Sequence, residues 1–342
     1  MKRESTTFSI RDRATRPSTL VAFVLTALLL FALWNVAKSF NLEQVGSTIA
    51  RANAVALAVA LAACVGTLIL RGLRWRVLIG SINISISRRA AVEILALSFW
   101  VNVILPAKIG DVYRAWLLKR NGGSSFGRAV GTVVVERAVD LITVALLGAL
   151  SAYVAFGGNY SPVVFALTLI ALALALFGAA VLLLARGPAA RLVARLPLPA
   201  AAAEPIARAF DALRDGSRQR ALTAVAPYTL VIWALQATRF GCVAVALGLF
   251  QIDPAPGFLG ISAVLFTALV SAVLSTIPFT PAGIGAVEAG SVGILISVFA
   301  IPPEAAIALT LLDRVLDIGS LMAGGGILFA VSPYPRGAGS LR

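Results

Sequence analysis

The sequence contains no histidine and only two cysteines in 342 residues. The absence of histidine excludes His-based proton transfer and His-ligated metal sites. Cys64 and Cys242 each lie alone in an apolar segment, so neither has the spacing of a metal ligand. Both are expected to be small buried side chains. We therefore expect no metal ion and no cofactor.

Charged residues are also scarce. They make up 13% of the chain, against about 25% in soluble domains, while 59% of the residues are hydrophobic and the mean hydropathy is +0.94. These values exclude an ordinary soluble domain and predict an all-α polytopic membrane protein. The net charge of +14 does not indicate nucleic-acid binding, because the basic residues lie between apolar runs and form no basic domain.

Long apolar runs predict about six full transmembrane helices, since a helix rises about 1.5 Å per residue and must cross a core of about 30 Å. The six runs are 20–37, 52–70, 131–156, 163–185, 222–250 and 305–331. Two further apolar stretches, 90–118 and 258–300, are interrupted by Pro and Gly. Each is predicted to be a re-entrant hairpin of two half-helices. The run 20–37 is expected to remain as a span, because it is longer than the apolar region of a signal peptide and no clear cleavage site follows.

The distribution of Lys and Arg orients these segments. Most of the 29 basic residues, including Arg71 and Arg74, fall in segments assigned to the cytoplasm, whereas only Lys38 and Arg51 fall in segments assigned to the outside. This predicts a multi-pass protein of the cytoplasmic (inner) membrane with both termini in the cytoplasm. The predicted divisions are a basic tail, one membrane domain, a cytoplasmic linker within it and a short C-terminal tail, at 1–17, 18–333, about 186–220 and 334–342. The linker is either an amphipathic helix on the membrane surface or a solvated segment.

Two sequence motifs occur twice in the same order. The segments 105–112 and 280–287 share the pattern Pro-Ala-x-Ile-Gly-x-Val. Downstream, Glu136-Arg137-x-x-Asp140 matches Asp313-Arg314-x-x-Asp317. These matches predict an internal duplication with repeats at about 88–156 and 257–331. Because three spans separate the hairpins, the repeats are predicted to have inverted topology, the arrangement that points to a transporter binding site.

The duplicated triplets place charges inside apolar spans, where each costs roughly 2.5–3.5 kcal/mol at a helix centre. Glu136 and Asp140 share a helix face at i,i+4, and Arg137 can reach Asp140 at i,i+3. Asp313, Arg314 and Asp317 repeat this geometry. The triplets are either buried ion pairs that lock helices together or the wall of a polar cavity that meets a charged headgroup or a proton.

Further candidate residues flank the two breaks. Lys108, Asp111 and Arg114 follow the first break and Glu288 follows the second, while Asn102 precedes the first and can cap freed backbone groups. Lys and Arg beside half-helix N-termini suit phosphate. The predicted turn residues are Pro106, Gly110, Pro278, Pro281, Gly283 and Gly285. Arg239, inside another span, is expected to join this site or to pair with an acid.

The ordered motifs resemble a known family. They are Arg71-x-x-Arg74-Trp75, the segment from Asn102 to Arg114, Glu136-Arg137-x-x-Asp140, the segment from Pro278 to Glu288, and Asp313-Arg314. Together they resemble the lysylphosphatidylglycerol synthase transmembrane-region family of flippase-like integral membrane proteins, which includes the N-terminal half of the multiple peptide resistance factor. The resemblance covers about 18–333. It implies lipid translocation or a related role in handling polar lipids, with the hairpins and charged triplets lining the path. Only 332–342 follow, too few for that factor's aminoacyltransferase, so we do not expect lipid aminoacylation.

Three functions fit these features. The first is a lipid flippase or scramblase whose cavity at the repeat interface binds an anionic headgroup through Lys108, Arg114, Arg137 and Arg314. The second, an intramembrane prenyl-pyrophosphate phosphatase, is disfavoured because the turn after Pro281 offers no nucleophilic Ser. The third is a non-transporting scaffold for a separate lipid-modifying enzyme, in which the triplets matter for stability alone. We expect a transporter rather than an enzyme, with a phospholipid or other polar lipid as its partner.

Overall fold

The computed structural model describes residues 42–105, 107–122, 125–186, 200–252, 254, 257–275 and 281–341. The predicted first span at 20–37 and the basic tail at 1–17 lie outside the described residues. Within the described part the elements are helical: α3 (Leu42–Ala50), α4 (Ala54–Ser81), α5 (Arg88–Ile104), α6 (Ile109–Arg120), α7 (Phe126–Phe156), α8 (Pro162–Arg186), α10 (Ala200–Gly216), α11 (Gln219–Ala246), α12 (Ile261–Leu274), η1 (Pro281–Gly283), α13 (Ala286–Ser297), α14 (Pro303–Val331) and η2 (Tyr334–Arg336).

Five of the described helices are long and apolar enough to cross a membrane: α4, α7, α8, α11 and α14. Their outward faces carry large apolar side chains. Leu146 and Leu150 of α7 and Leu176 and Phe177 of α8, for example, are each about 60% exposed. Water would not tolerate so much exposed apolar surface, whereas lipid tails do. The structure therefore confirms a polytopic all-α membrane protein, with five of the six predicted spans in its described part.

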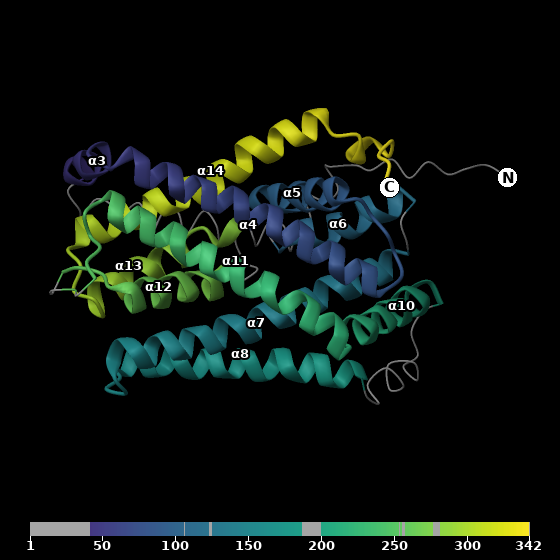
Figure 1. The fold of residues 1–342 in the computed structure, drawn as a ribbon, viewed down its shortest axis with the longest axis horizontal. Helices are drawn as coiled ribbons and strands as arrows, with labels where there is room; N and C mark the ends of the chain where they lie inside the picture. The colour runs from purple at the N-terminus through teal and green to yellow at the C-terminus, as the bar shows by residue number, and fades with distance from the viewer. Residues whose placement is uncertain are drawn as a thin grey trace.

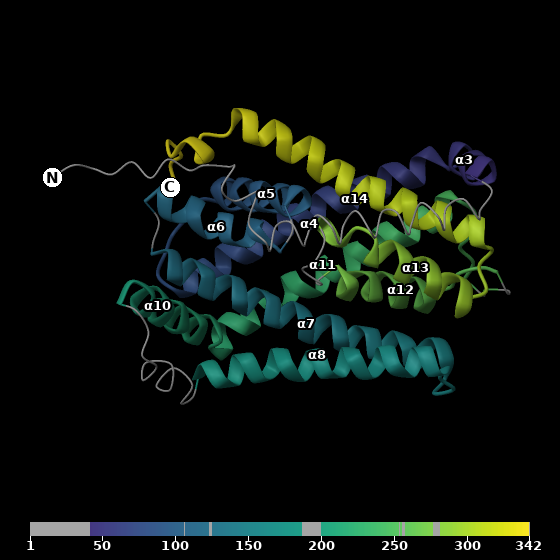
Figure 2. The same cartoon turned by 180° about the vertical axis from the view of Figure 1, so that it is seen from behind.

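Both interrupted stretches fold as pairs of half-helices, as predicted. The first hairpin is α5–α6, and the second is α12–α13 with η1 between its arms. Figures 1 and 2 show the two hairpins entering the bundle from opposite ends, and α5 packs against η1 at the tip of the other hairpin. The broken segments therefore meet in the middle of the molecule. The second tip is enclosed by protein at Gly283 and Gly285, whereas Leu105, Ala107 and Ile109 at the first tip are exposed.

The two hairpin tips adopt the same unusual backbone conformation. Ala107 and Lys108 have φ angles of 62° and 53°, and the matching residues Ala282 and Gly283 have 51° and 72°. Residues other than glycine are uncommon in this left-handed region, at a cost of roughly 1–2 kcal/mol each. Two such residues at matched positions show that the repeated motif encodes a repeated turn. The predicted turn residues Pro106 and Pro278 lie outside the described residues.

The packing of the helices follows the inverted repeat. α4 and α11 lie against each other through the centre, α5 packs on α14 of the other half, and α12 packs on α7. α7 and α8 run side by side along one flank (Figures 1 and 2). The correspondence also includes α4 and α11, which precede the predicted repeats. Both have 28 residues, and each carries an arginine twenty residues after its first residue, Arg74 and Arg239.

The predicted linker contains α10, which packs closely against α7. Cβ atoms added to Gly127 and Gly131 of α7 would lie 2.1 and 2.3 Å from the carbonyl oxygens of Pro205 and Ala209. The two glycines thus let the backbones of α7 and α10 touch. The part of the linker at 187–199 lies outside the described residues.

Gly110 offers a test of the first hairpin. A Cβ on Gly110 would lie 1.9 Å from the carbonyl oxygen of Ser98, which belongs to the other arm. We expect Gly110→Ala to force the arms apart and to lower the free energy of unfolding by about 1–3 kcal/mol or more. Thermal unfolding of the detergent-solubilised protein measures the loss.

Gly148→Ala on α7 is the matched control, because a Cβ there meets nothing within 4 Å. It should leave the unfolding temperature unchanged or slightly raised, since alanine favours a helix over glycine. Equal stability of both variants would contradict the close contact between the arms.

Candidate functional site

The first of two buried charge clusters is centred on Arg74 of α4, which is 1% exposed. Its Nη1 donates to Asp140 Oδ1 at 2.6 Å and its Nη2 donates to Glu136 Oε1 at 3.1 Å, both on α7. Nη1 also donates to Thr229 Oγ1 of α11 at 3.1 Å. The shared face of Glu136 and Asp140, predicted from their i,i+4 spacing, thus holds one guanidinium that ties three helices together.

Arg114 of α6 satisfies the other oxygen of Glu136. Its Nη1 donates to Glu136 Oε2 at 2.9 Å, its side chain is fully buried, and its guanidinium stacks over Trp75 with 4.9 Å to the ring centroid. Glu136 therefore lies between two guanidinium groups and cannot be a free acid. Arg114 itself holds the second arm of the first hairpin against α4 and α7.

The main partner of Arg137 is Asp111. Its Nε and Nη2 donate to the two Asp111 oxygens at 3.2 and 3.3 Å, and it lies 3.9 Å from Asp140. Asp111 also lies 3.8 Å from Arg114. The i,i+3 contacts predicted from sequence within α6 and α7 are present, but the shorter bond of Arg137 joins two different helices.

The second cluster repeats this design in the other half. Arg239 of α11 binds both oxygens of Asp313 at 2.9 and 3.0 Å and also pairs with Asp317, so it bridges the two acids of α14 as Arg74 bridges those of α7. Arg314 Nε donates to Glu288 Oε1 at 2.7 Å, and its Nη1 lies 3.7 Å from Asp317. Arg239 thus pairs with acids, one of the two roles predicted for it.

The hairpin tips are fastened differently in the two halves. Glu288 binds Arg314 and also accepts the backbone N–H of Gly285 at 2.5 Å, while Arg314 Nη2 donates to the Ala282 carbonyl at 2.7 Å. In the first half the two contacts come from two different residues. Asn102 accepts the N–H of Gly110 at 2.7 Å, and Asp111 binds Arg137. This division explains why the acid occupies different positions in the two repeats.

Two predictions about α4 were wrong. Arg71 and Arg74 were assigned to a cytoplasmic loop after a span ending at residue 70, but α4 continues to Ser81 and buries both side chains. A prediction from apolar runs alone ends a helix at its first arginine. Here the arginines stay inside the bundle because they pair with carboxylates of α7. The helical spacing of Arg71, Arg74 and Trp75 with the preceding apolar residues was the available signal.

Two basic side chains in the centre have no hydrogen-bonded partner among the described residues. Arg71 is buried, lies 3.9 Å from Asp140, and has its guanidinium 5.5 Å from the ring centroids of both Phe99 and Trp233. Lys108, at the first hairpin tip, is half-buried and interacts electrostatically with Asp111 as well as with Arg71, Arg137 and Arg314.

The charge balance differs between the clusters. The first holds five basic and three acidic side chains, namely Arg71, Arg74, Lys108, Arg114 and Arg137 with Asp111, Glu136 and Asp140. The second holds two basic and three acidic side chains, namely Arg239 and Arg314 with Glu288, Asp313 and Asp317. The excess of positive charge therefore belongs to the first half, around Arg71 and Lys108.

Long apolar helices that enclose two broken hairpins and their paired charges define a polytopic all-α membrane protein with an internal repeat. The chain belongs to the family described as the lysylphosphatidylglycerol synthase transmembrane region, whose sequence profile matches residues 19–325. This confirms the resemblance found in the motifs.

Two curated proteins are similar in sequence. A UPF0104 membrane protein of Methanocaldococcus jannaschii is 27% identical over 238 residues, which cover 68% of this chain and 94% of that protein. The glycosyltransferase AglD of Haloferax volcanii is 25% identical over 351 residues, which cover 93% of this chain and 55% of that protein. This chain thus spans about half the length of the second relative. The matches support a membrane protein in lipid- or glycolipid-related processes.

Arg74 provides a test of the buried pairs. Replacing it in Arg74→Met leaves Glu136 and Asp140 facing each other with less compensation, so we expect the free energy of unfolding to fall by about 3–5 kcal/mol. Arg239→Met should act in the same direction in the second half. Thermal unfolding in detergent measures both.

The matched control is Arg88→Gln, because the Arg88 side chain is exposed and has no hydrogen bond or ion pair with a described residue. It should leave the unfolding temperature nearly unchanged. Adding Asp140→Asn to Arg74→Met should recover part of the loss, because Arg74 is the close partner of Asp140 whereas Glu136 keeps Arg114. An Arg74→Met protein as stable as wild type would contradict the assigned role.

Proposed function

We propose that the protein moves a phosphate-bearing lipid headgroup across the cytoplasmic membrane through the space between the two hairpin tips. The observation that carries the proposal is the excess positive charge around Arg71 and Lys108. Cations inside a membrane protein that carboxylates do not fully balance are costly, and they mark substrate or ion paths. An anion bound between them would satisfy both.

The donor set suits a phosphate group. Arg71 offers a planar guanidinium and Lys108 a compact ammonium at the N-terminal end of α6, where the helix dipole also favours an anion. Phe99 and Trp233 flank Arg71 and keep its direction fixed. The other predicted headgroup ligands, Arg114, Arg137 and Arg314, already bind carboxylates, so in this proposal they hold the hairpins in place.

A lipid is the proposed source of the anion for two reasons. The family and the curated relatives support a role connected with lipids or glycolipids. A headgroup could also pass the hairpin tips while its acyl chains stay in the surrounding bilayer, so the protein would need no apolar tunnel. We further propose that both termini face the cytoplasm, as the positive-inside distribution predicts.

A transport assay tests this proposal. Full-length protein in liposomes should accelerate the movement of labelled lipids, tried as a panel of phospholipids and prenyl-phosphate lipids. Arg71→Gln and Lys108→Gln should each slow movement about tenfold or more, because each removes a charge-assisted bond to the headgroup. Arg89→Gln, an exposed arginine on the first hairpin, is the control and should transport at the wild-type rate.

Two outcomes would count against the proposal. No acceleration with any lipid of the panel would remove the transport function. Transport that is unchanged in both Arg71→Gln and Lys108→Gln would remove this binding site while leaving transport in place. Unfolding temperatures of the variants separate a lost ligand from a lost fold.

A second candidate is a non-transporting partner of a lipid-modifying enzyme. It is favoured by the Haloferax relative, which is named a glycosyltransferase and of which this chain spans about half. In that case the charge clusters matter only for stability. Arg71→Gln and Lys108→Gln would then change the unfolding temperature alone, because the wild-type protein would move no lipid.

A further inference from the structure

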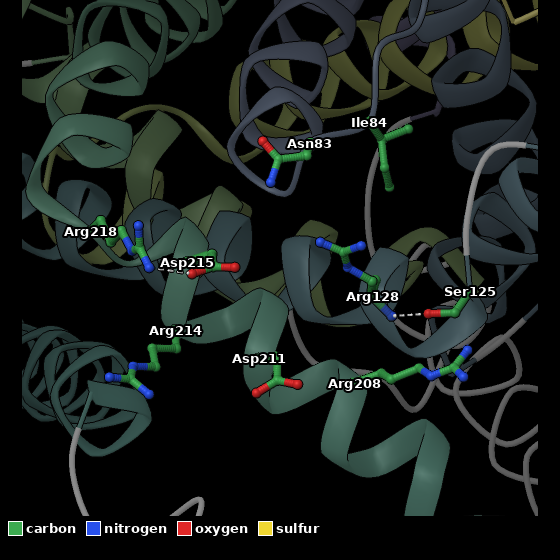
Figure 3. Close-up of a pocket in the computed structure, with 9 residues that line it drawn as sticks. All are labelled: Asn83, Ile84, Ser125, Arg128, Arg208, Asp211, Arg214, Asp215 and Arg218. Atoms are coloured by element: carbon green, nitrogen blue, oxygen red, sulfur yellow. Dashed lines mark hydrogen bonds and ion pairs between the residues drawn. The ribbon is translucent and has the colours of Figure 1, made fainter.

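A pocket with basic side chains lies away from the two charge clusters, at the end of the molecule where α10 meets the beginnings of α7 and α11. Its volume is about 750 Å³, within the range of roughly 300–1,000 Å³ typical of small-ligand sites. Four arginines and two aspartates line it: Arg128, Arg208, Arg214, Arg218, Asp211 and Asp215. Figure 3 shows these side chains arranged around one space.

Ion pairs between neighbouring residues neutralise part of the positive charge of the pocket. Arg218 pairs with Asp215 at 2.9 Å, and Arg208 pairs with Glu204 on its own helix. The side chain of Arg214 has no hydrogen bond or ion pair with any described residue, and Arg128 donates through Nη2 to the Ile82 carbonyl at 2.7 Å. Arg128 and Arg214 therefore meet one remaining carboxylate, Asp211, and the pocket keeps net positive charge.

The backbone also makes the electrostatic potential of the pocket more positive. Ser125 and Arg218, which are the N-cap residues of α7 and α11, both line the pocket, so two long helices begin there. Helix N-termini attract anions. The close backbone contact of α10 with Gly127 and Gly131 fixes the wall that carries Arg208 and Arg214. The backbone that carries Arg208 and Arg214 is thus part of a packed helix.

We propose that this pocket binds a phosphate group, as a site separate from the central one. It lies at the ends of spanning helices, where basic pockets meet anionic headgroups. A phosphomonoester lipid at the bilayer surface and a soluble diphosphate present the same chemistry to four arginines. The proposal does not depend on the transport function, because it uses none of the central residues.

Calorimetric titration of the full-length protein in detergent tests the pocket. The probes are dihexanoyl phosphatidic acid for the lipid source and inorganic pyrophosphate for the soluble source. We expect Arg214→Gln and Arg128→Gln each to weaken binding about tenfold, as the loss of one charge-assisted bond predicts. Arg214→Gln breaks no described contact, so it remains informative if Arg128→Gln fails to fold.

Two controls complete the experiment. Arg88→Gln removes one exposed positive charge at the start of α5, outside the pocket, and should bind as wild type. Lys119→Gln removes a second exposed positive charge, on α6 and also outside the pocket, and should likewise bind as wild type.

The outcome also identifies the source of the phosphate. Binding of phosphatidic acid alone assigns the pocket to a lipid headgroup, and equal binding of pyrophosphate assigns it to the phosphate group itself. Failure of both probes to bind, or an equal loss in Arg88→Gln and Arg214→Gln, would overturn the proposal, because the latter result shows only general surface charge.

Discussion

The structure depends on one interaction, a buried guanidinium held between two carboxylates, which is present once in each half. Arg74 joins α4 to Glu136 and Asp140 of α7, and Arg239 joins α11 to Asp313 and Asp317 of α14. Each pair costs desolvation energy that only good geometry and extra hydrogen bonds return. In exchange, the pairs fix the register of long apolar helices that could otherwise slide past one another in lipid.

The remaining charged residues of the clusters extend these anchors to the hairpins. Arg137 binds Asp111 beyond the first tip, and Arg314 binds both Glu288 and the carbonyl of Ala282 at the second tip. The strained turns at Ala107 and Ala282 are therefore held by neighbouring charges, as strained backbone requires. What distinguishes the halves is the extra positive charge of the first.

Much of this could be read from sequence. Five of the predicted spans, both hairpins, the inverted repeat of the turns and the capping role of Asn102 agree with the structure, and the family profile confirms the resemblance. The misassignment of Arg71 and Arg74 has a physical cause. A hydropathy scale assigns each arginine a large cost of insertion into the membrane. It takes no account of a carboxylate on another helix that pairs with the arginine and lowers this cost.

The sequence by itself determined the local features, because apolar length, Pro and Gly punctuation and i,i+4 spacing act within a few turns of one helix. Only the tertiary structure decided which cation meets which acid. Arg74 and Asp140 are 66 residues apart in sequence, and Arg239 and Asp313 are 74 apart. Their pairing arises when the helices pack against each other, and it leaves Arg71 and Lys108 as the members of the described central clusters without a hydrogen-bonded partner.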